Sequence, residues 1–182
     1  MASRRLIVLG IVMIVAPAIA HAHATVWPKR SAPGAYERYF LRVPNEKDNP
    51  TTQVEIHFPQ GMRVVSFEDV PGWELRVLTD SAKAIVGAVW TGTLPPHRFV
   101  EFPFEAANPK SRARVAWPTI QTYASGERVE WTGPEHAKEP ASITVIAPAG
   151  LSGATWLAGL ALLLSLVSLG LILRGPSRSQ RP

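Results

Sequence analysis

The middle of the chain alternates between apolar and polar residues with a period of two, which is the pattern of half-buried β-strands. Residues 52–58 show it most clearly, because Val54, Ile56 and Phe58 fall on one face and polar residues fall between them. Similar short runs cover residues 36–43, 62–70, 73–78, 84–90, 99–104, 114–117, 120–123, 128–131 and 143–146. Many short strands at this spacing, with no competing helical window, predict an all-β sandwich or barrel.

Proline and glycine separate these runs, as at Pro33-Gly34, Pro71-Gly72 and Gly133-Pro134, and both residues are typical of turns. There is no internal repeat, so residues 23–147 are expected to form one domain, followed by a short linker at 148–154. The chain has no cysteine. The domain must therefore be stabilised by its apolar core alone, and thiolate metal sites and thiol redox chemistry are excluded.

The first 22 residues have the three parts of a secretory signal peptide. Arg4 and Arg5 supply positive charge, residues 6–15 are almost entirely apolar, and Ala20-His21-Ala22 has the small-x-small pattern of a cleavage site. The apolar run is too short to cross a bilayer as a helix. The sequence therefore predicts that residues 1–22 are removed on export.

The C-terminal part contains an uncharged segment at residues 155–173, which begins near Trp156. As a helix rising about 1.5 Å per residue, it would reach roughly 28 Å, close to the thickness of a bilayer core. Arg174 and two further arginines follow it, and positive residues stay on the cytoplasmic side. We expect a single transmembrane helix, a cytoplasmic tail at 174–182, and a domain on the periplasmic or extracellular side of the cytoplasmic membrane.

The net charge of +5 belongs to these two ends of the chain. Of the 19 lysines and arginines, five lie in the predicted signal and tail, and the remaining 14 equal the 14 acidic residues, which all lie between Glu37 and Glu139. The predicted external domain is formally neutral, so a nucleic-acid partner is not expected.

Cleavage after Ala22 would make His23 the first residue of the mature protein. A terminal histidine chelates a metal by itself, because its α-amine and its Nδ1 close a ring on one ion. The reference pKa of an α-amine is about 7.7, so the amine loses its proton far more easily than lysine does. Nitrogen donors favour Cu(II), and Met62 is the only methionine outside the predicted signal, so the soft sulfur donors of Cu(I) sites are scarce.

Two alternatives stay open at this terminus. Ala18-Ile19-Ala20 is also a cleavage pattern, and cutting there would leave His21-Ala22-His23. A histidine at position three binds Cu(II) through the amine, two deprotonated amides and the imidazole. The other alternative is that His23 is simply a polar residue that follows a cleavage site.

The remaining candidate ligands are weaker from pattern alone. Alternation turns Glu101 away from the face of Val100, Phe102 and Phe104, and a carboxylate among so much apolar surface must be solvated, paired or bound to a metal. Trp131 ends a predicted strand, where a tryptophan usually belongs to the core. Three histidines have no partner at ligand spacing and are expected on the surface: His57, His97 and His136.

Seven blocks of sequence resemble the YcnI family of exported copper-binding domains. They are His23-Ala24-Thr25-Val26-Trp27-Pro28, Gly34-Ala35-Tyr36-Glu37, Val43-Pro44-Asn45-Glu46-Lys47-Asp48, Val70-Pro71-Gly72-Trp73, Phe99-Val100-Glu101-Phe102-Pro103-Phe104, Gln121-Thr122-Tyr123-Ala124-Ser125-Gly126 and Val129-Glu130-Trp131-Thr132-Gly133-Pro134. The resemblance implies an immunoglobulin- or cupredoxin-like β-sandwich that binds Cu(II). It implies His23 and Glu101 as metal ligands, with Trp131 beside the metal.

The function expected from this resemblance is a non-enzymatic, membrane-anchored copper protein that acts in copper homeostasis as a chaperone, store or supplier. A membrane copper transporter or a periplasmic copper carrier is the partner that the resemblance implies. Two other classes are weighed against it. A copper-dependent oxidoreductase would pair the terminal histidine with a second one, and a structural or adhesion domain would bind no metal.

Overall fold

The structure is a computed structural model that describes residues 23–148 and 153–173. The predicted signal peptide (1–22), cytoplasmic tail (174–182) and most of the predicted linker lie outside these residues.

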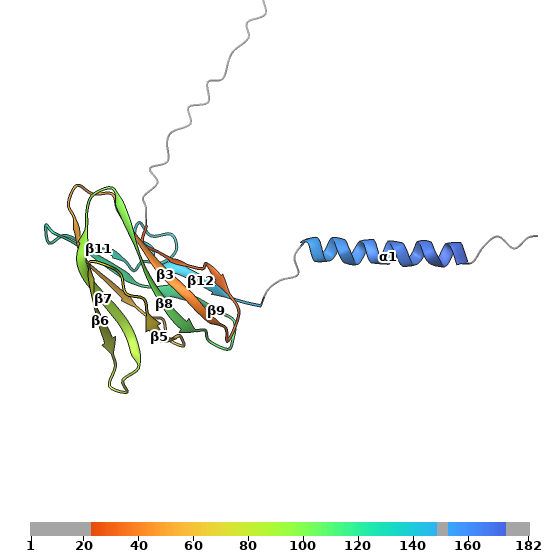
Figure 1. Cartoon of the computed structure of the whole chain (residues 1–182), viewed down its shortest axis with the longest axis horizontal. Helices are drawn as coiled ribbons and strands as arrows, with labels where there is room; N and C mark the ends of the chain where they lie inside the picture. Colours follow the sequence, from red (N-terminus) through yellow and green to blue (C-terminus); the bar gives the residue numbers. More distant parts are fainter. Residues whose placement is uncertain (1–22, 149–152, 174–182) are drawn as a thin grey trace, which may run out of the picture.

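The described residues form twelve strands in three hydrogen-bonded sheets (Figure 1). The four-stranded sheet has the order β1 (Thr25–Trp27), β3 (Tyr36–Asn45), β8 (Arg98–Ala107) and β5 (Arg63–Phe67). The five-stranded sheet has the order β11 (Arg128–Trp131), β10 (Thr119–Tyr123), β4 (Thr51–His57), β7 (Ile85–Leu94) and β6 (Trp73–Thr79). The three-stranded sheet has the order β2 (Arg30–Ser31), β12 (Ser142–Ile146) and β9 (Ala113–Trp117).

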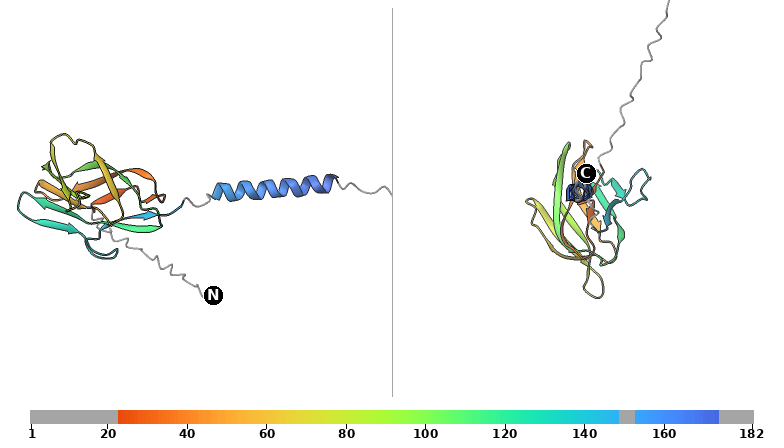
Figure 2. Two further views of the ribbon diagram at one scale, coloured as in Figure 1. Left: turned by 90° about the horizontal axis from the view of Figure 1, so that it is seen from below. Right: turned by 90° about the vertical axis from the view of Figure 1, so that its right-hand side faces the viewer.

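Large aromatic side chains from the three sheets meet in one core. Phe102 of β8 stacks on Trp90 of β7, with ring centroids 4.5 Å apart. Tyr39 of β3 lies 5.1 Å from Trp117 of β9. All four are almost completely buried, and aromatic side chains of this size dominate core energetics. The all-β sandwich predicted from the alternation is confirmed for residues 23–148 (Figure 2).

Two strands were not predicted from the sequence. β1 has three residues and β2 has two, and Pro28 lies between them, so neither is long enough to show an alternating pattern. They exist because of their partners: β1 pairs antiparallel with β3, and β2 pairs parallel with β12.

The C-terminal segment is helical as α1 (Gly153–Leu173). Its side chains are described from Leu157 to Gly170, and all of them are exposed. Among the described residues, no helix meets the combined length and apolar character needed to cross a membrane. The transmembrane segment expected at 155–173 stays a prediction.

The two ends of β3 define the two ends of the sandwich. They lie about 30 Å apart, since a strand rises about 3.3 Å per residue and β3 has ten residues. At the end near Tyr36, Ile146 pairs with Ser31, and Ser31 accepts a hydrogen bond from Asn108. β12 therefore ends near the Tyr36 end of β3, at the opposite end of the sandwich from Asn45.

Candidate functional site

His23 precedes β1, and β1 is fixed on both sides. Thr25 pairs with Arg42 of β3, while the backbone N–H of Val26 donates to Oγ of Ser142 on β12 at 2.8 Å. Ala24 and Val26 are only 1% and 0% exposed, whereas His23 is half-buried. The first residues of the described domain are thus anchored in the core, and His23 is held where they begin.

The imidazole of His23 lies against the indole of Trp131. Their ring centroids are 5.0 Å apart and the ring planes are inclined by 57°. Trp131 is the last residue of β11 and is only 8% exposed. The sequence pattern assigned Trp131 to the core, and the family resemblance assigned it to the metal site. The structure brings it next to His23, 108 positions earlier in the chain.

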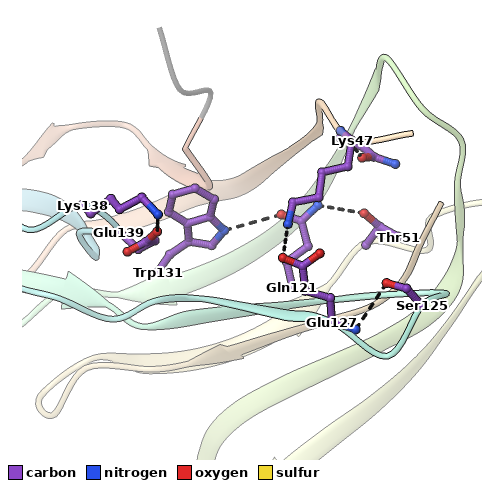
Figure 3. Close-up of polar contacts among 9 residues, drawn as sticks. Lys47, Thr51, Gln121, Ser125, Glu127, Trp131, Lys138 and Glu139 are labelled. Carbon is purple, nitrogen blue, oxygen red and sulfur yellow. Dashed lines mark hydrogen bonds and ion pairs between the residues drawn. The ribbon is translucent and has the colours of Figure 1, made fainter. Parts of the chain in front are cut away.

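A buried glutamine links Trp131 to Thr51 of β4 (Figure 3) and to the end of β3. The Nε1–H of Trp131 donates a long hydrogen bond of 3.5 Å to Oε1 of Gln121. The amide nitrogen of Gln121 donates to the backbone oxygen of Pro44 at 2.9 Å and to Oγ1 of Thr51 at 2.8 Å. Gln121 is fully buried, so these contacts fix the indole relative to the last residues of β3.

An open cavity of about 640 Å³ lies beside Trp131. Its lining comes from the end of β3 and the loop after it, from the β10–β11 hairpin, and from the loop before β12: Pro44, Glu46, Lys47, Tyr123, Glu127, Arg128, Val129, Glu130, Trp131, Lys138 and Glu139. Three ion pairs join lining residues to one another: Lys47 with Glu127, Arg128 with Glu130 at 3.7 Å, and Lys138 with Glu139 at 3.2 Å. The cavity therefore combines apolar surface with charges of both signs.

A second, smaller hollow of about 350 Å³ includes His23 itself, together with Lys29, Glu135 and Ser142. The Nζ of Lys29 donates to Oγ of Ser142 at 2.8 Å. Burial lowers the pKa of Lys29, because removal from water disfavours the ammonium form. Glu135 forms an ion pair with Arg114 at 2.8 Å.

Glu101 lies on the outer surface of the four-stranded sheet. It is opposite Arg42, which is itself opposite Thr25, so the three form a row across β8, β3 and β1. Nε of Arg42 donates to Oε1 of Glu101 at 2.8 Å, and a second guanidinium nitrogen lies 2.6 Å from the same oxygen. Glu101 lines neither the large cavity nor the hollow around His23. Both of these contacts are to Oε1 of Glu101.

Glu46 is a second candidate carboxylate, which the sequence alone did not single out. β1 runs antiparallel to β3 with Thr25 opposite Arg42, and the same register continued by two residues sets His23 opposite Pro44. Glu46 follows two residues later and lines the cavity that Trp131 also lines. The sequence did contain a signal for Glu46, because residues 43–48 form one of the family-like blocks. No candidate ligand was taken from that block.

None of the other three histidines lines the hollow that includes His23. Nε2 of His57 lies 2.8 Å from Glu55, and His97 is 3.9 Å from Asp48 with a largely exposed side chain. His136 is in the loop before β12 and is exposed. Within the part of the chain that the structure describes, no three His, Asp or Glu side chains gather as a metal cluster.

Comparison with known proteins identifies the family. The family described as "Domain of unknown function (DUF1775)" matches residues 23–149. The chain belongs to this family. Its domain thus begins at His23, the residue that the predicted cleavage would make the mature N-terminus.

Two relatives add to this identification. The copper-binding protein CutI of Bacillus subtilis (strain 168) is 38% identical over 146 residues, which is 79% of this chain and 70% of CutI. An uncharacterized protein from Nocardia farcinica, whose crystal structure has an immunoglobulin-like fold, is 28% identical, with a TM-score of 0.62. That match covers 69% of this chain and 98% of the Nocardia chain. The predicted immunoglobulin-like sandwich is therefore confirmed.

The link through Gln121 gives a direct test of the site's geometry. Gln121→Leu has a similar volume but cannot bond Trp131, Pro44 or Thr51, so we expect a loss of about 1–3 kcal/mol in the free energy of unfolding. The indole N–H resonance of Trp131 should also shift. Urea unfolding and nuclear magnetic resonance measure the two effects. Gln53→Leu, at a partly exposed position of β4, is the matched control, and an equal loss in both variants would contradict the argument.

Proposed function

We propose that this protein binds one Cu(II) ion through His23 as the first residue of its mature form. The observation that carries the proposal is the contact between His23 and Trp131, beside a partly polar cavity and on an N-terminal strand anchored in the core. The Bacillus relative is named a copper-binding protein, which supports copper as the metal.

The available donor atoms fit this ion. Once the signal is removed, His23 offers the α-amine and Nδ1, and Glu46 offers a carboxylate from the cavity next to Trp131. Nitrogen and carboxylate donors suit Cu(II), and Cu(II) is the strongest binder among the divalent first-row metals. Met62 is buried in the core, and the chain has no cysteine. A sulfur-rich Cu(I) site therefore has no support.

We favour Glu46 over Glu101 as the carboxylate ligand. Glu46 belongs to the same cavity as Trp131, whereas Glu101 is engaged by Arg42 through two nitrogen atoms. That pair is partly exposed and adds little to the stability of the folded state, so the preference rests on the place of Glu46 in the cavity that Trp131 lines. Glu101 stays the competing ligand, as the family resemblance implies.

We propose copper as cargo, in a role of supply or storage in copper homeostasis. One histidine with a carboxylate leaves positions on the ion open, which suits exchange with a membrane copper transporter or another copper carrier. An oxygenase-like centre would need a second histidine as a ligand. Among the described residues, His57 lies beside Glu55 and His97 near Asp48, and no three His, Asp or Glu side chains gather as a metal cluster. Nothing in the described structure supports such a centre.

We also propose that the domain is exported and anchored by residues 155–173, with the copper site outside the cytoplasmic membrane. The support is the signal-like N-terminus and the uncharged segment followed by arginines. The chain expressed with its own leader should appear in the membrane fraction with an intact mass that begins at His23. A mass that begins at His21 would replace the proposed chelate with a position-three copper motif. A mass that retains residues 1–22 would eliminate the free amine and the site.

The protein that begins at His23 should bind one Cu(II) and prefer it to Zn(II) under matched conditions. Binding should weaken as the pH falls, because protons compete with the metal for the amine and the imidazole. His23→Ala removes the ring donor and should abolish this site, while His136→Ala, on an exposed loop, is the matched control. Isothermal titration and electron paramagnetic resonance measure stoichiometry and ligation. Equal or tighter Zn(II) binding, or two equivalent copper sites, would count against the proposal.

Replacing each carboxylate separately distinguishes the two candidate ligands. Glu46→Gln keeps the side-chain shape and removes the charge, so we expect a loss of about tenfold in Cu(II) affinity, or about 1.4 kcal/mol, and a changed resonance spectrum. Glu101→Gln should lower the Cu(II) affinity less, because the carboxylate of Glu101 is already paired with Arg42. The reverse order would assign the site to Glu101. A triple variant changes His57, His97 and His136 to Asn. If this variant loses the copper site while both glutamate variants keep it, the centre has more than one histidine ligand.

A further inference from the structure

The large cavity runs along the free edge of a sheet. The strand order places β11 at the end of the five-stranded sheet, and all four residues of β11 line the cavity. An edge strand presents backbone N–H and C=O groups that a further strand can pair with. The cavity therefore offers backbone hydrogen-bonding groups in addition to charged side chains.

The hairpin geometry shows which groups face outward. The N–H of Tyr123 donates to the backbone oxygen of Glu127 at 2.9 Å, so the backbone groups of Glu127 face β10. Hydrogen bonding alternates along an antiparallel pair, so Val129 also faces β10, while Arg128 and Glu130 face away from it. The oxygen of Glu130 accepts from the N–H of Thr132 at 2.9 Å. Three backbone groups therefore point outward from the edge of the sheet: the N–H of Arg128, the C=O of Arg128 and the N–H of Glu130.

The side chains around this edge suit an extended peptide. Tyr123, Val129 and Trp131 supply apolar and aromatic surface, and three ion pairs of balanced sign surround them. The exposed partners of these pairs can exchange their contacts for those of a polar ligand at small cost, because such pairs stabilise a protein little. The volume of about 640 Å³ lies within the usual range of roughly 300–1,000 Å³ for ligand pockets.

We propose that β11 accepts an extended peptide segment of a copper-exchanging partner as an additional strand, and that a histidine side chain on this segment binds the copper held at His23. This inference rests on the function proposed above. β11 ends at Trp131, whose ring contacts His23, so a strand paired along β11 runs toward the metal position. Main-chain pairing of this kind provides affinity, and side chains at alternate positions provide specificity.

Transfer then proceeds by exchange of ligands on Cu(II), with no change of oxidation state. The imidazole nitrogen of the peptide forms a bond to copper as the carboxylate of Glu46 leaves as an anion. Transfer is completed when the α-amine and Nδ1 of His23 also release the ion, and further donors of the partner or water molecules take their places. The cavity lies near the Asn45 end of β3, whereas β12 ends at the opposite end of the domain. A partner can therefore approach the cavity without passing the end of β12.

The probe is the peptide acetyl-Lys-Thr-His-Thr-Glu-amide, added to the processed, isotope-labelled full chain in detergent. Copper binding is first measured without the peptide, which tests the proposed function by itself. Hydrogen exchange in the copper-free protein then tests strand pairing, and we expect the amides of Arg128 and Glu130 to become protected. With copper present, the electron paramagnetic resonance spectrum should show one additional nitrogen ligand on the copper. A peptide with Ala in place of its histidine should protect the same amides without this gain.

Two variants at one position separate backbone from side-chain effects. Glu130→Pro removes the outward N–H but leaves the β10 pairing intact, and it should weaken peptide binding about three- to tenfold, as expected for one lost hydrogen bond. Glu130→Gln keeps the N–H and should bind within about twofold of the original. A peptide with both threonines replaced by proline should fail to bind, which tests the pairing even if Glu130→Pro does not fold.

Several results would overturn the inference. Protection outside β11, or unchanged affinity in Glu130→Pro, would show that the peptide does not add a strand. Equal affinity for free imidazole would show that the site takes the ring alone. If copper binds and no peptide pairs with β11, the strand inference fails while the proposed function stands. If the peptide pairs but the protein does not bind copper, the proposed function fails, and the copper-exchange role of the strand fails with it.

Discussion

The short strand β1 is held between β3 of its own sheet and β12 of the three-stranded sheet. The geometry of the candidate site depends on this attachment. Ends of domains are usually poorly ordered unless something ties them down. Here β1 pairs with β3, Val26 is fully buried and its N–H bonds Ser142. Burial of a side chain of this size stabilises the fold by about 2 kcal/mol. A ligand that belongs to a chain terminus can be positioned only if the next few residues are fixed in this way.

Trp131, which contacts the ring of His23, is held in place by polar contacts inside the core. Gln121 is fully buried and bonds Thr51, Pro44 and the indole of Trp131. A buried amide without partners would be costly, so this arrangement is strongly preferred once the sandwich closes. The same residue therefore orients the tryptophan and holds the end of β3, where the loop with Glu46 begins. These two parts of the cavity are mechanically connected through one side chain.

The charged rim of the cavity contributes little to stability. Its ion pairs are largely exposed, and such pairs are worth little to the folded state. They can therefore rearrange around a ligand. The pair between Arg42 and Glu101 is also partly exposed, but it lies on the outer surface of the four-stranded sheet and outside the lining of the cavity, with Arg42 4.8 Å from the ring of Phe99. The two carboxylates differ in surroundings although both lie close to β1 in the topology.

Local pattern determined the sandwich, because a period of two requires only neighbouring residues, and the strands with alternating Val54 and Ile56 or Phe102 and Phe104 were predicted on that basis. It also made His23 a candidate ligand, because the predicted cleavage would place this residue at the mature N-terminus. Tertiary structure alone decided the rest. β1 and β2 are too short to show a pattern and exist only through their partners. The sequence offered Glu101 as a candidate carboxylate and did not single out Glu46. Strand register sets Glu101 against Arg42, and the loop after β3 brings Glu46 to the cavity that Trp131 lines.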